Sequence, residues 1–107
     1  ADIEASGGVA TYVTGDVASP DDMERVAQAA IESFGGFDTW VNNASTSIYG
    51  RLDEVHLDDK RRLFDVVYWG VVHGCRAALP HLKQHGGAIV NIGSVASDVA
   101  IPLLGAY

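Results

Sequence analysis

The chain has 107 residues, of which 48% are hydrophobic and 20% are charged, and its formal net charge is −7 at pH 7. This size and composition are typical of one globular domain at most and exclude an intrinsically disordered chain. Nucleic acids and anionic membranes also carry negative charge, so the acidic balance disfavours non-specific binding to either of them, and we expect neither as a partner.

The cysteine, the histidines and the hydropathy pattern further narrow the class of protein. The single cysteine, Cys75, excludes an internal disulfide, and its apolar helical surroundings indicate a small buried hydrophobic residue. No run of 18 apolar residues and no basic leader with an apolar stretch is present, so we expect a cytoplasmic protein. The four histidines lack metal-ligand spacing, which predicts no metal site. We interpret them as solvated or helix-capping residues, and the basic cluster 60–62 as a solvated helix face.

The first third of the chain predicts a strand and an amphipathic helix. Residues 1–5 are typical of the last turn of a helix, and the glycines after them indicate a turn. Residues 9–14 mix β-branched and aromatic side chains and predict a short strand. Ser19 and Pro20 form a typical helix start, apolar residues then recur every three or four positions, and Gly35 stops the pattern. We therefore predict a helix over 20–34.

Two further strands are predicted, and the second of them ends in a hydroxyl group. Residues 37–41 have the apolar character of a strand, and residues 42–50 form a polar loop. The β-branched run 89–93 predicts a buried parallel strand that presents Ser94 at its carboxyl end, where open α/β sheets bind ligands. Tyr107 follows Ser94 by 13 residues across a loop, so the two hydroxyl groups can come together.

A long helix is predicted between these strands, from about residue 58 to residue 84. Between Leu63 and Val72 it is apolar nearly all round, which indicates burial on two sides. One side can pack on the sheet and the other on a partner subunit. Gly70 and Gly74 lie four residues apart, where missing side chains let another backbone approach. We therefore expect a homodimer or homotetramer assembled through the long helix 58–84.

A series of short motifs runs along the whole chain. In chain order they are Asp16-Val17, Asp38 to Ser45, Tyr68 to Gly74, Ala77 to Pro80, Ile89 to Ser94, and Tyr107. This order and these gaps resemble the short-chain dehydrogenase/reductase family, although they cover only the middle of that family's domain. The resemblance implies that residues 1–107 are a fragment of a single NAD(P)-binding, Rossmann-like domain.

The fold expected from pattern and resemblance is of the α/β class. We predict a partial doubly wound parallel sheet with three strands and two main helices of a larger domain. In the family's strand order, the strands 37–41 and 89–93 are neighbours. Two other strands separate the strand 9–14 from them, so we expect no continuous three-stranded sheet within one isolated chain.

The resemblance also implies a reaction and a set of site residues. The reaction is hydride transfer between NAD or NADP and a small-molecule alcohol, ketone or aldehyde. Tyr107 would exchange a proton with the substrate oxygen, and Ser94 would hold that oxygen. The implied cofactor-binding residues are Asp16 and Val17, next to the adenine ring, and Asn42, Asn43, Ala44, Ser45, Ile92 and Gly93. Without the family pattern, Asp16 and the asparagines are ordinary turn residues.

Four departures from the family pattern leave a second hypothesis open. The family has a lysine four residues after the tyrosine, a glycine at the position of Ser45, an asparagine at the position of Val67, and a glycine-rich phosphate loop. Valine cannot bind the water that the asparagine supports. We expect the 107-residue fragment to be inactive by itself. The alternative is a non-catalytic binding or assembly module on the same fold, and the sequence chooses neither the substrate nor between NAD and NADP.

Overall fold

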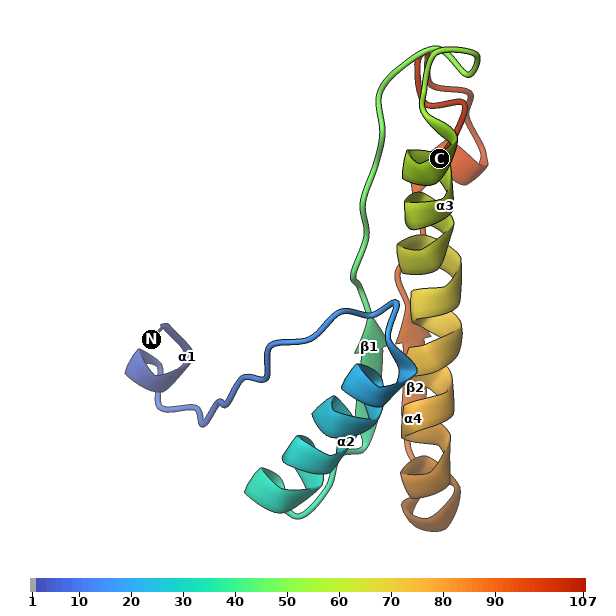
Figure 1. Ribbon diagram of the computed structural model, residues 1–107. Helices are drawn as coiled ribbons and strands as arrows, with labels where there is room; N and C mark the ends of the chain where they lie inside the picture. Colours follow the sequence, from blue (N-terminus) through green and yellow to red (C-terminus); the bar gives the residue numbers. More distant parts are fainter. Residues whose placement is uncertain (1) are drawn as a thin grey trace.

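A computed structural model describes residues 2–107 and shows two parallel strands flanked by helices (Figure 1). The strands are β1 (Thr39–Asn42) and β2 (Ala88–Asn91), and helix α4 (Gly70–His85) packs against both of them and against α2 (Pro20–Phe34). The described part of the predicted N-terminal helix end forms α1 (Asp2–Ala5), while Ala1 lies outside the described residues. The molecule is therefore of the predicted α/β class.

Helix α2 has the bounds that its capping residues predict. The Ser19 hydroxyl accepts a hydrogen bond from the Asp22 backbone N–H at 3.3 Å, and Pro20 occupies the first turn. At the other end Gly35 has a φ of 81°, a left-handed conformation that glycine adopts without strain, and its N–H donates to the Ile31 carbonyl at 2.9 Å. Met23 on the apolar face is buried against the rest of the molecule.

The two strands pair as predicted, with small shifts of their ends. Thr39 lies opposite Ala88 and Asn42 opposite Asn91 in a parallel register. The strands thus begin and end within two residues of the predicted ranges 37–41 and 89–93. Parallel pairing requires a long crossover connection, which the helical segment between them provides. Both carboxyl ends consequently lie at the same edge of the sheet.

The predicted strand 9–14 is absent, so the sheet has two strands and not three. These residues form no ladder, and the side chains of Val9 and Tyr12 are 82% and 90% exposed. Figure 1 shows this segment, drawn in blue, running away from the sheet towards α1. A strand is stable only when its backbone groups pair with a neighbouring strand, and within the described residues none lies beside this one.

The long helical segment is continuous but is not one regular α-helix. It consists of α3 (Leu57–Phe64), a π-helical segment over Asp65–Trp69, and α4, which continues through Pro80 to His85. The π-helical segment was not predicted, because the sequence there contains no proline or glycine that would mark a break. Such segments occur frequently at functional sites.

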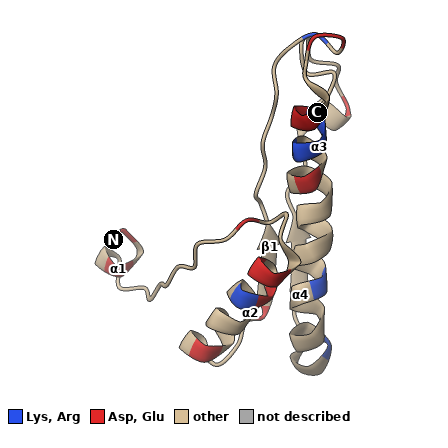
Figure 2. Ribbon diagram, viewed as in Figure 1, with Lys and Arg blue, Asp and Glu red and all other residues tan. Residues whose placement is uncertain are grey.

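The two glycines of the long helix approach their own chain, which corrects the reason given above for self-association. A Cβ atom at Gly70 would meet the Val17 side chain at 2.7 Å, and one at Gly74 would collide with the Asn42 amide oxygen. Both glycines are buried. The long helix has a second apolar feature at its surface. No Asp, Glu, Lys or Arg occurs between residues 66 and 75 (Figure 2), and exposed aromatic side chains lie on or beside this stretch, with Phe64 58%, Tyr68 56% and Trp69 48% exposed.

Candidate active site

The carboxyl ends of β1 and β2 are tied together by Asn42. Its side-chain N–H donates to the Asn91 side-chain oxygen at 2.8 Å, and its own side-chain oxygen accepts from the Trp40 indole at 2.8 Å. The Asn42 carbonyl accepts from the Ile92 backbone N–H at 3.0 Å, one residue beyond the end of β2. The Asn42 amide group is therefore used to hold the two strand ends in place beneath the loops that follow them.

A cavity of about 220 Å³ opens at this edge of the sheet. It brings together most of the residues that the sequence singled out, from both strand ends and from the C-terminal loop: Asn42, Ala44, Ser45, Ile92, Gly93, Ser94 and Tyr107. The long helix supplies Val67, from its π-helical segment, and Val71 to the same wall. Val67, at the position where the family has asparagine, thus presents an apolar side chain to the cavity.

A second cavity, of about 410 Å³, shares part of its wall with the first. The shared residues are Ser45, Ser94, Ala96 and Tyr107, and the remaining wall comes from the loops 46–49 and 101–104. These two loops are held together, because the Gly50 backbone N–H donates to the Leu103 carbonyl at 2.9 Å. Three hydroxyl groups consequently lie at the boundary between two neighbouring cavities.

The electrostatics at this boundary favour ionisation of the phenol. Hydrogen bonds to the Ser94 hydroxyl and then to the Ser45 hydroxyl lower the pKa of Tyr107 from its ordinary value of 10.0, against a smaller opposing effect of burial. Ser94 is itself held in place, since its hydroxyl accepts from the Ala96 backbone N–H at 3.2 Å. A phenol of lowered pKa beside an oriented hydroxyl can exchange a proton with an oxygen atom bound next to it.

Asp16 lines a third cavity, of about 480 Å³, together with Val17, Ala44 and Ser45. Its carboxylate accepts hydrogen bonds from the Ala18 backbone N–H at 3.0 Å and from the Arg62 Nη2 atom at 3.0 Å, and its second oxygen lies 2.9 Å from the Arg62 Nη1 atom in an ion pair. The hydrogen bond from Arg62, followed by that from Ala18, lowers the pKa of Asp16.

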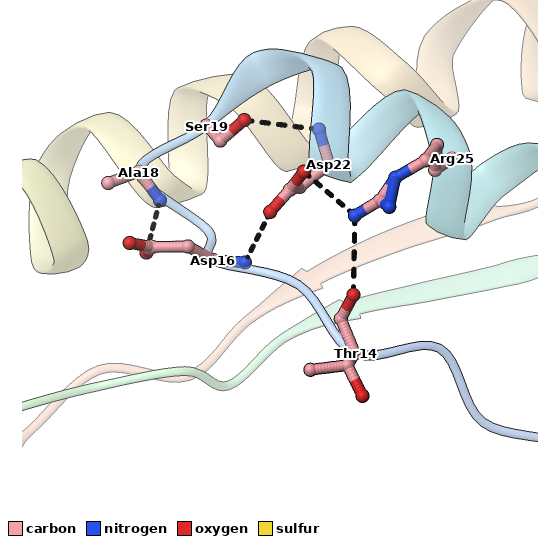
Figure 3. Close-up of polar contacts among 6 residues, drawn as sticks. All are labelled: Thr14, Asp16, Ala18, Ser19, Asp22 and Arg25. Atoms are coloured by element: carbon pink, nitrogen blue, oxygen red, sulfur yellow. Dashed lines mark hydrogen bonds and ion pairs between the residues drawn. The ribbon is translucent and has the colours of Figure 1, made fainter.

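The backbone around Asp16 is anchored to the start of α2, as Figure 3 shows. The Asp16 N–H donates to the Asp22 carboxylate at 2.8 Å, and Arg25 joins that carboxylate to the Thr14 carbonyl. The segment that carries Asp16 is thus fixed by three consecutive contacts, although the residues before Thr14 are not.

Two predicted residues and two histidines occupy other positions. Asn43 lies away from the 220 Å³ cavity and lines, with Val17 and Ala44, a neighbouring one of about 190 Å³. The Val17 carbonyl lies 3.1 Å from the His73 Nδ1 atom, and His81 Nε2 accepts from the Phe37 backbone N–H, so these two half-buried histidines contact distant segments, which the expected solvated or helix-capping positions did not include. His56 caps α3 as expected.

Two contacts of the site were not predicted from the sequence. Arg62 was assigned to a solvated helix face, but it binds Asp16, which lies 46 residues away in the chain. Ser45 was implied as a cofactor-binding residue, but its contact with Tyr107 in the C-terminal loop was not predicted. No local pattern marks such distant contacts.

The described residues contain neither a membrane-spanning helix nor a cluster of metal ligands. No helix among residues 2–107 combines the length and the apolar character that crossing a bilayer requires. Within the same residues, no group of three or more histidine, cysteine, aspartate or glutamate side chains is arranged to hold a metal ion.

Comparison with known proteins links this geometry to a family. The chain is 42% identical over 99 residues to the uncharacterized oxidoreductase YxnA of Bacillus subtilis, an alignment that covers 91% of this chain and 28% of that protein. A short chain dehydrogenase/reductase from Burkholderia phymatum in complex with NAD superposes with a TM-score of 0.91 at 34% identity, over 99% of this chain and 38% of that one.

A second solved structure gives the same result. The alcohol dehydrogenase of the archaeon Thermococcus sibiricus, complexed with 5-hydroxy-NADP, superposes with a TM-score of 0.88 at 28% identity, over 98% of this chain and 45% of that one. The family model for short chain dehydrogenases matches residues 1–107. The chain spans between 28% and 42% of the length of the first curated relatives. It therefore belongs to the short chain dehydrogenase family and has a partial Rossmann-type fold.

Proposed function

We propose that these residues belong to an NAD(P)-dependent oxidoreductase that interconverts an alcohol and a ketone or aldehyde. The observation that carries the proposal is the meeting of Ser94 and Tyr107 at one cavity wall, with the pKa of the phenol lowered by its hydroxyl neighbours. Because the chain spans less than half the length of its relatives, the proposal concerns a protein that contains it, with residues 1–107 as part of one cofactor-binding domain.

In this proposal Tyr107 carries the proton and Ser94 orients the substrate. When an alcohol is oxidised, the phenolate accepts the hydroxyl proton; when a carbonyl is reduced, the phenol returns it. The Ser94 hydroxyl hydrogen-bonds the same substrate oxygen and keeps it within reach of the phenol. A nicotinamide cofactor supplies or accepts the hydride when bound. The lowered pKa of Tyr107 raises the fraction of phenolate near neutral pH, which assists the oxidation.

The residues at the sheet edge leave room for the flat rings of a dinucleotide cofactor. A Cβ atom at Gly93 would meet no atom within 4 Å, so this backbone is open to a ligand, and Ala44 presents only a methyl group. The Asp16 carboxylate accepts two hydrogen bonds and forms an ion pair with Arg62, whereas two carboxylate oxygens offer about four acceptor positions. An acceptor position therefore remains for an amino group of adenine. We propose Asp16, Val17, Asn42 to Ser45, Ile92 and Gly93 as the cofactor-binding residues, with NAD or NADP as the cofactor.

The second candidate function is a binding or assembly module without catalysis. Val67 favours it, because this side chain faces the cavity and cannot hold the water of a proton relay. The lowered pKa of Tyr107 favours the enzyme, since a binding module has no use for an ionisable phenol at its centre. Substrate and cofactor turnover separates the two hypotheses.

The test uses the longer protein that contains this chain. Turnover is followed by NAD(P)H absorbance with a panel of alcohols and ketones, and cofactor binding is measured separately by calorimetry. Tyr107→Phe should lower kcat by a factor on the order of a hundred to ten thousand and leave cofactor affinity about unchanged. Val67→Asn should raise the rate or leave it alone. If a folded Tyr107→Phe protein keeps most of its activity, the assignment of Tyr107 is wrong.

Self-association through the long helix forms a second part of the proposal. Its support is the exposed aromatic stretch with Phe64, Tyr68 and Trp69, which carries no charge over residues 66–75. Large exposed apolar patches are typical of protein interfaces. Analytical ultracentrifugation tests this: a monomer at high micromolar concentration would contradict it, and Tyr68→Glu should weaken a dimer or tetramer.

A further inference from the structure

Tyr107 is approached by serine hydroxyls from both strands of the sheet. Ser94 follows β2, and Ser45 follows β1, so the two serines extend from neighbouring strand ends. Both line the same two cavities as Tyr107 does, of about 220 and 410 Å³. Ser94 already has a role in the proposed function. The Ser45 hydroxyl does not, because Ser45 has been proposed only as part of the cofactor-binding segment.

We propose that Ser45 is a positioning residue for Tyr107, whose hydroxyl donates a hydrogen bond to the phenolic oxygen from the β1 side while Ser94 holds it from the β2 side. This inference rests on the proposed function, in which Tyr107 transfers the proton. It assigns to Ser45 the task of fixing the phenol and of favouring its ionised form.

The polar side chains of the smaller cavity leave few other groups for this task. Asn42 uses its amide on Asn91, Cys75 and Trp40, and Ser97 donates its hydroxyl proton to the Ser94 carbonyl at 2.7 Å. The wall formed by the long helix at this cavity is apolar. Within this smaller cavity, Ser45 and Ser94 are consequently the hydroxyl groups that remain for the phenol, and both of them lower the pKa of Tyr107.

A positioning role and a space-filling role for Ser45 predict different results. A hydrogen bond donated to the phenolate stabilises the charged form, so its loss must raise the pKa of Tyr107. A side chain that only fills space can be replaced by another of similar size without any change in that pKa. Ser45→Ala keeps nearly the same volume and removes the hydroxyl, Ser45→Gly also empties the space, and Ser45→Thr keeps the hydroxyl.

The test measures the titration of Tyr107 directly in the longer protein that contains this chain. Tyrosine labelled with carbon-13 at the ring Cζ atom is followed by NMR against pH, and the Tyr107 resonance is assigned by its loss in Tyr107→Phe. Ser45→Ala and Ser45→Gly should move the midpoint of Tyr107 upward, and Ser45→Thr should stay close to the parent. Ser47→Ala is the matched control: it removes a hydroxyl from the same loop and should leave the midpoint unchanged.

Enzyme kinetics provide the second measurement. For alcohol oxidation, the acidic limb of the pH profile of kcat/KM should move upward with the NMR midpoint in Ser45→Ala. At neutral pH, kcat/KM should fall on the order of tenfold in Ser45→Ala, as expected for one lost hydrogen bond to a charged group.

The two measurements separate the two hypotheses. An unchanged Tyr107 midpoint in Ser45→Ala, or an equal shift in Ser47→Ala, would overturn the role of Ser45. A protein that shows the expected midpoint shifts but turns over no substrate keeps the role of Ser45 and rejects the proposed enzymatic function.

Discussion

Residues 88–91 and residues 9–14 have similar β-forming side chains, but only the backbone of 88–91 is paired in a sheet. The first stretch pairs with β1 along its whole length, and α4 packs on it. The second has no partner strand within the described residues, and the side chains of Val9 and Tyr12 are almost fully exposed. Strand propensity measures how well side chains fit a pleated, half-buried surface, so it has no effect where no such surface exists. Pairing partners, and not the residues themselves, decide between the two outcomes.

The same comparison applies to the two faces of the sheet. Trp40 and Asn42 point to the face that α4 covers and are half-buried, whereas Val41, between them, is exposed. Parallel sheets are normally covered on both faces. In the described residues α4 covers one face of the sheet, whereas Val41 and Val90 are exposed on the other face, and the candidate site lies at the carboxyl ends of the two strands.

The largest effect is expected on enzymatic activity, when the 107-residue chain with its two paired strands is assayed without the rest of the longer protein. The sequence has no glycine-rich phosphate loop, and its two lysines, Lys60 and Lys83, are not among the residues that line the cavities described above. We expect the purified 107-residue chain to turn over no alcohol or ketone with NAD or NADP. NAD(P)H absorbance measures this, with the longer protein as the positive control. Turnover by a preparation whose intact mass corresponds to 107 residues would show that the paired strands suffice.

A second prediction breaks the strand pair at its start. Gly87 has a φ of 133°, and a Cβ atom there would collide with the Asp38 carbonyl, which accepts the Ala88 N–H at 2.8 Å. Gly87→Ala should therefore lower the free energy of unfolding by roughly 1–3 kcal/mol from the backbone conformation alone, with the collision in addition. Urea unfolding measures the loss.

Gly86 offers a matched control for this substitution. Its φ of 82° is also positive, but a Cβ atom there would meet nothing within 4 Å. Gly86→Ala should cost less than Gly87→Ala, because it adds strain without a collision. Equal losses would mean that the pairing of β2 with β1 does not depend on the contact between residues 87 and 38.

A third prediction tests the unpaired stretch. Tyr12→Ala should change the free energy of unfolding by less than about 0.5 kcal/mol, because its exposed side chain loses no packing. Met23→Ala, in the buried face of α2, should cost roughly 2–5 kcal/mol. Amide hydrogen exchange should be fast over 9–14 and protected over 88–91. Protected amides in 9–14 would show that this stretch has found a partner strand.

The features that could be predicted from the sequence are those set by neighbouring residues. Ser19, Pro20 and Gly35 determine the ends of α2 through contacts within one turn, and these ends were predicted correctly. The pairing of the two strands followed from the resemblance and not from their residues. The π-helical segment and the contact between Arg62 and Asp16 depend on packing between distant elements, so neither could be predicted.

The smallest expected effect lies where the unpaired segment joins the rest of the molecule, at the ion pair of Asp16 and Arg62. The hydrogen bond from Arg62, and then that from Ala18, lowers the pKa of Asp16 from 3.8. A lowered carboxylate pKa contributes stability that is present above the unfolded-state pKa, near 3.8, and is lost as the pH falls through the folded-state pKa. Both side chains are exposed, so the contribution is small.

A double-mutant cycle with Asp16→Asn and Arg62→Gln measures the coupling between these two side chains by urea unfolding. We expect a small favourable coupling at neutral pH that disappears at low pH, once the Asp16 carboxylate is protonated, and that weakens with added salt. The pair Asp58 and Arg61, at 2.8 Å within one turn of α3, is the control, because it joins no separate segments. If both pairs give the same coupling, the contact between Asp16 and Arg62 is an ordinary surface ion pair. A larger coupling at Asp16 would mean that Arg62 helps to hold the loop that carries the proposed adenine-binding residue.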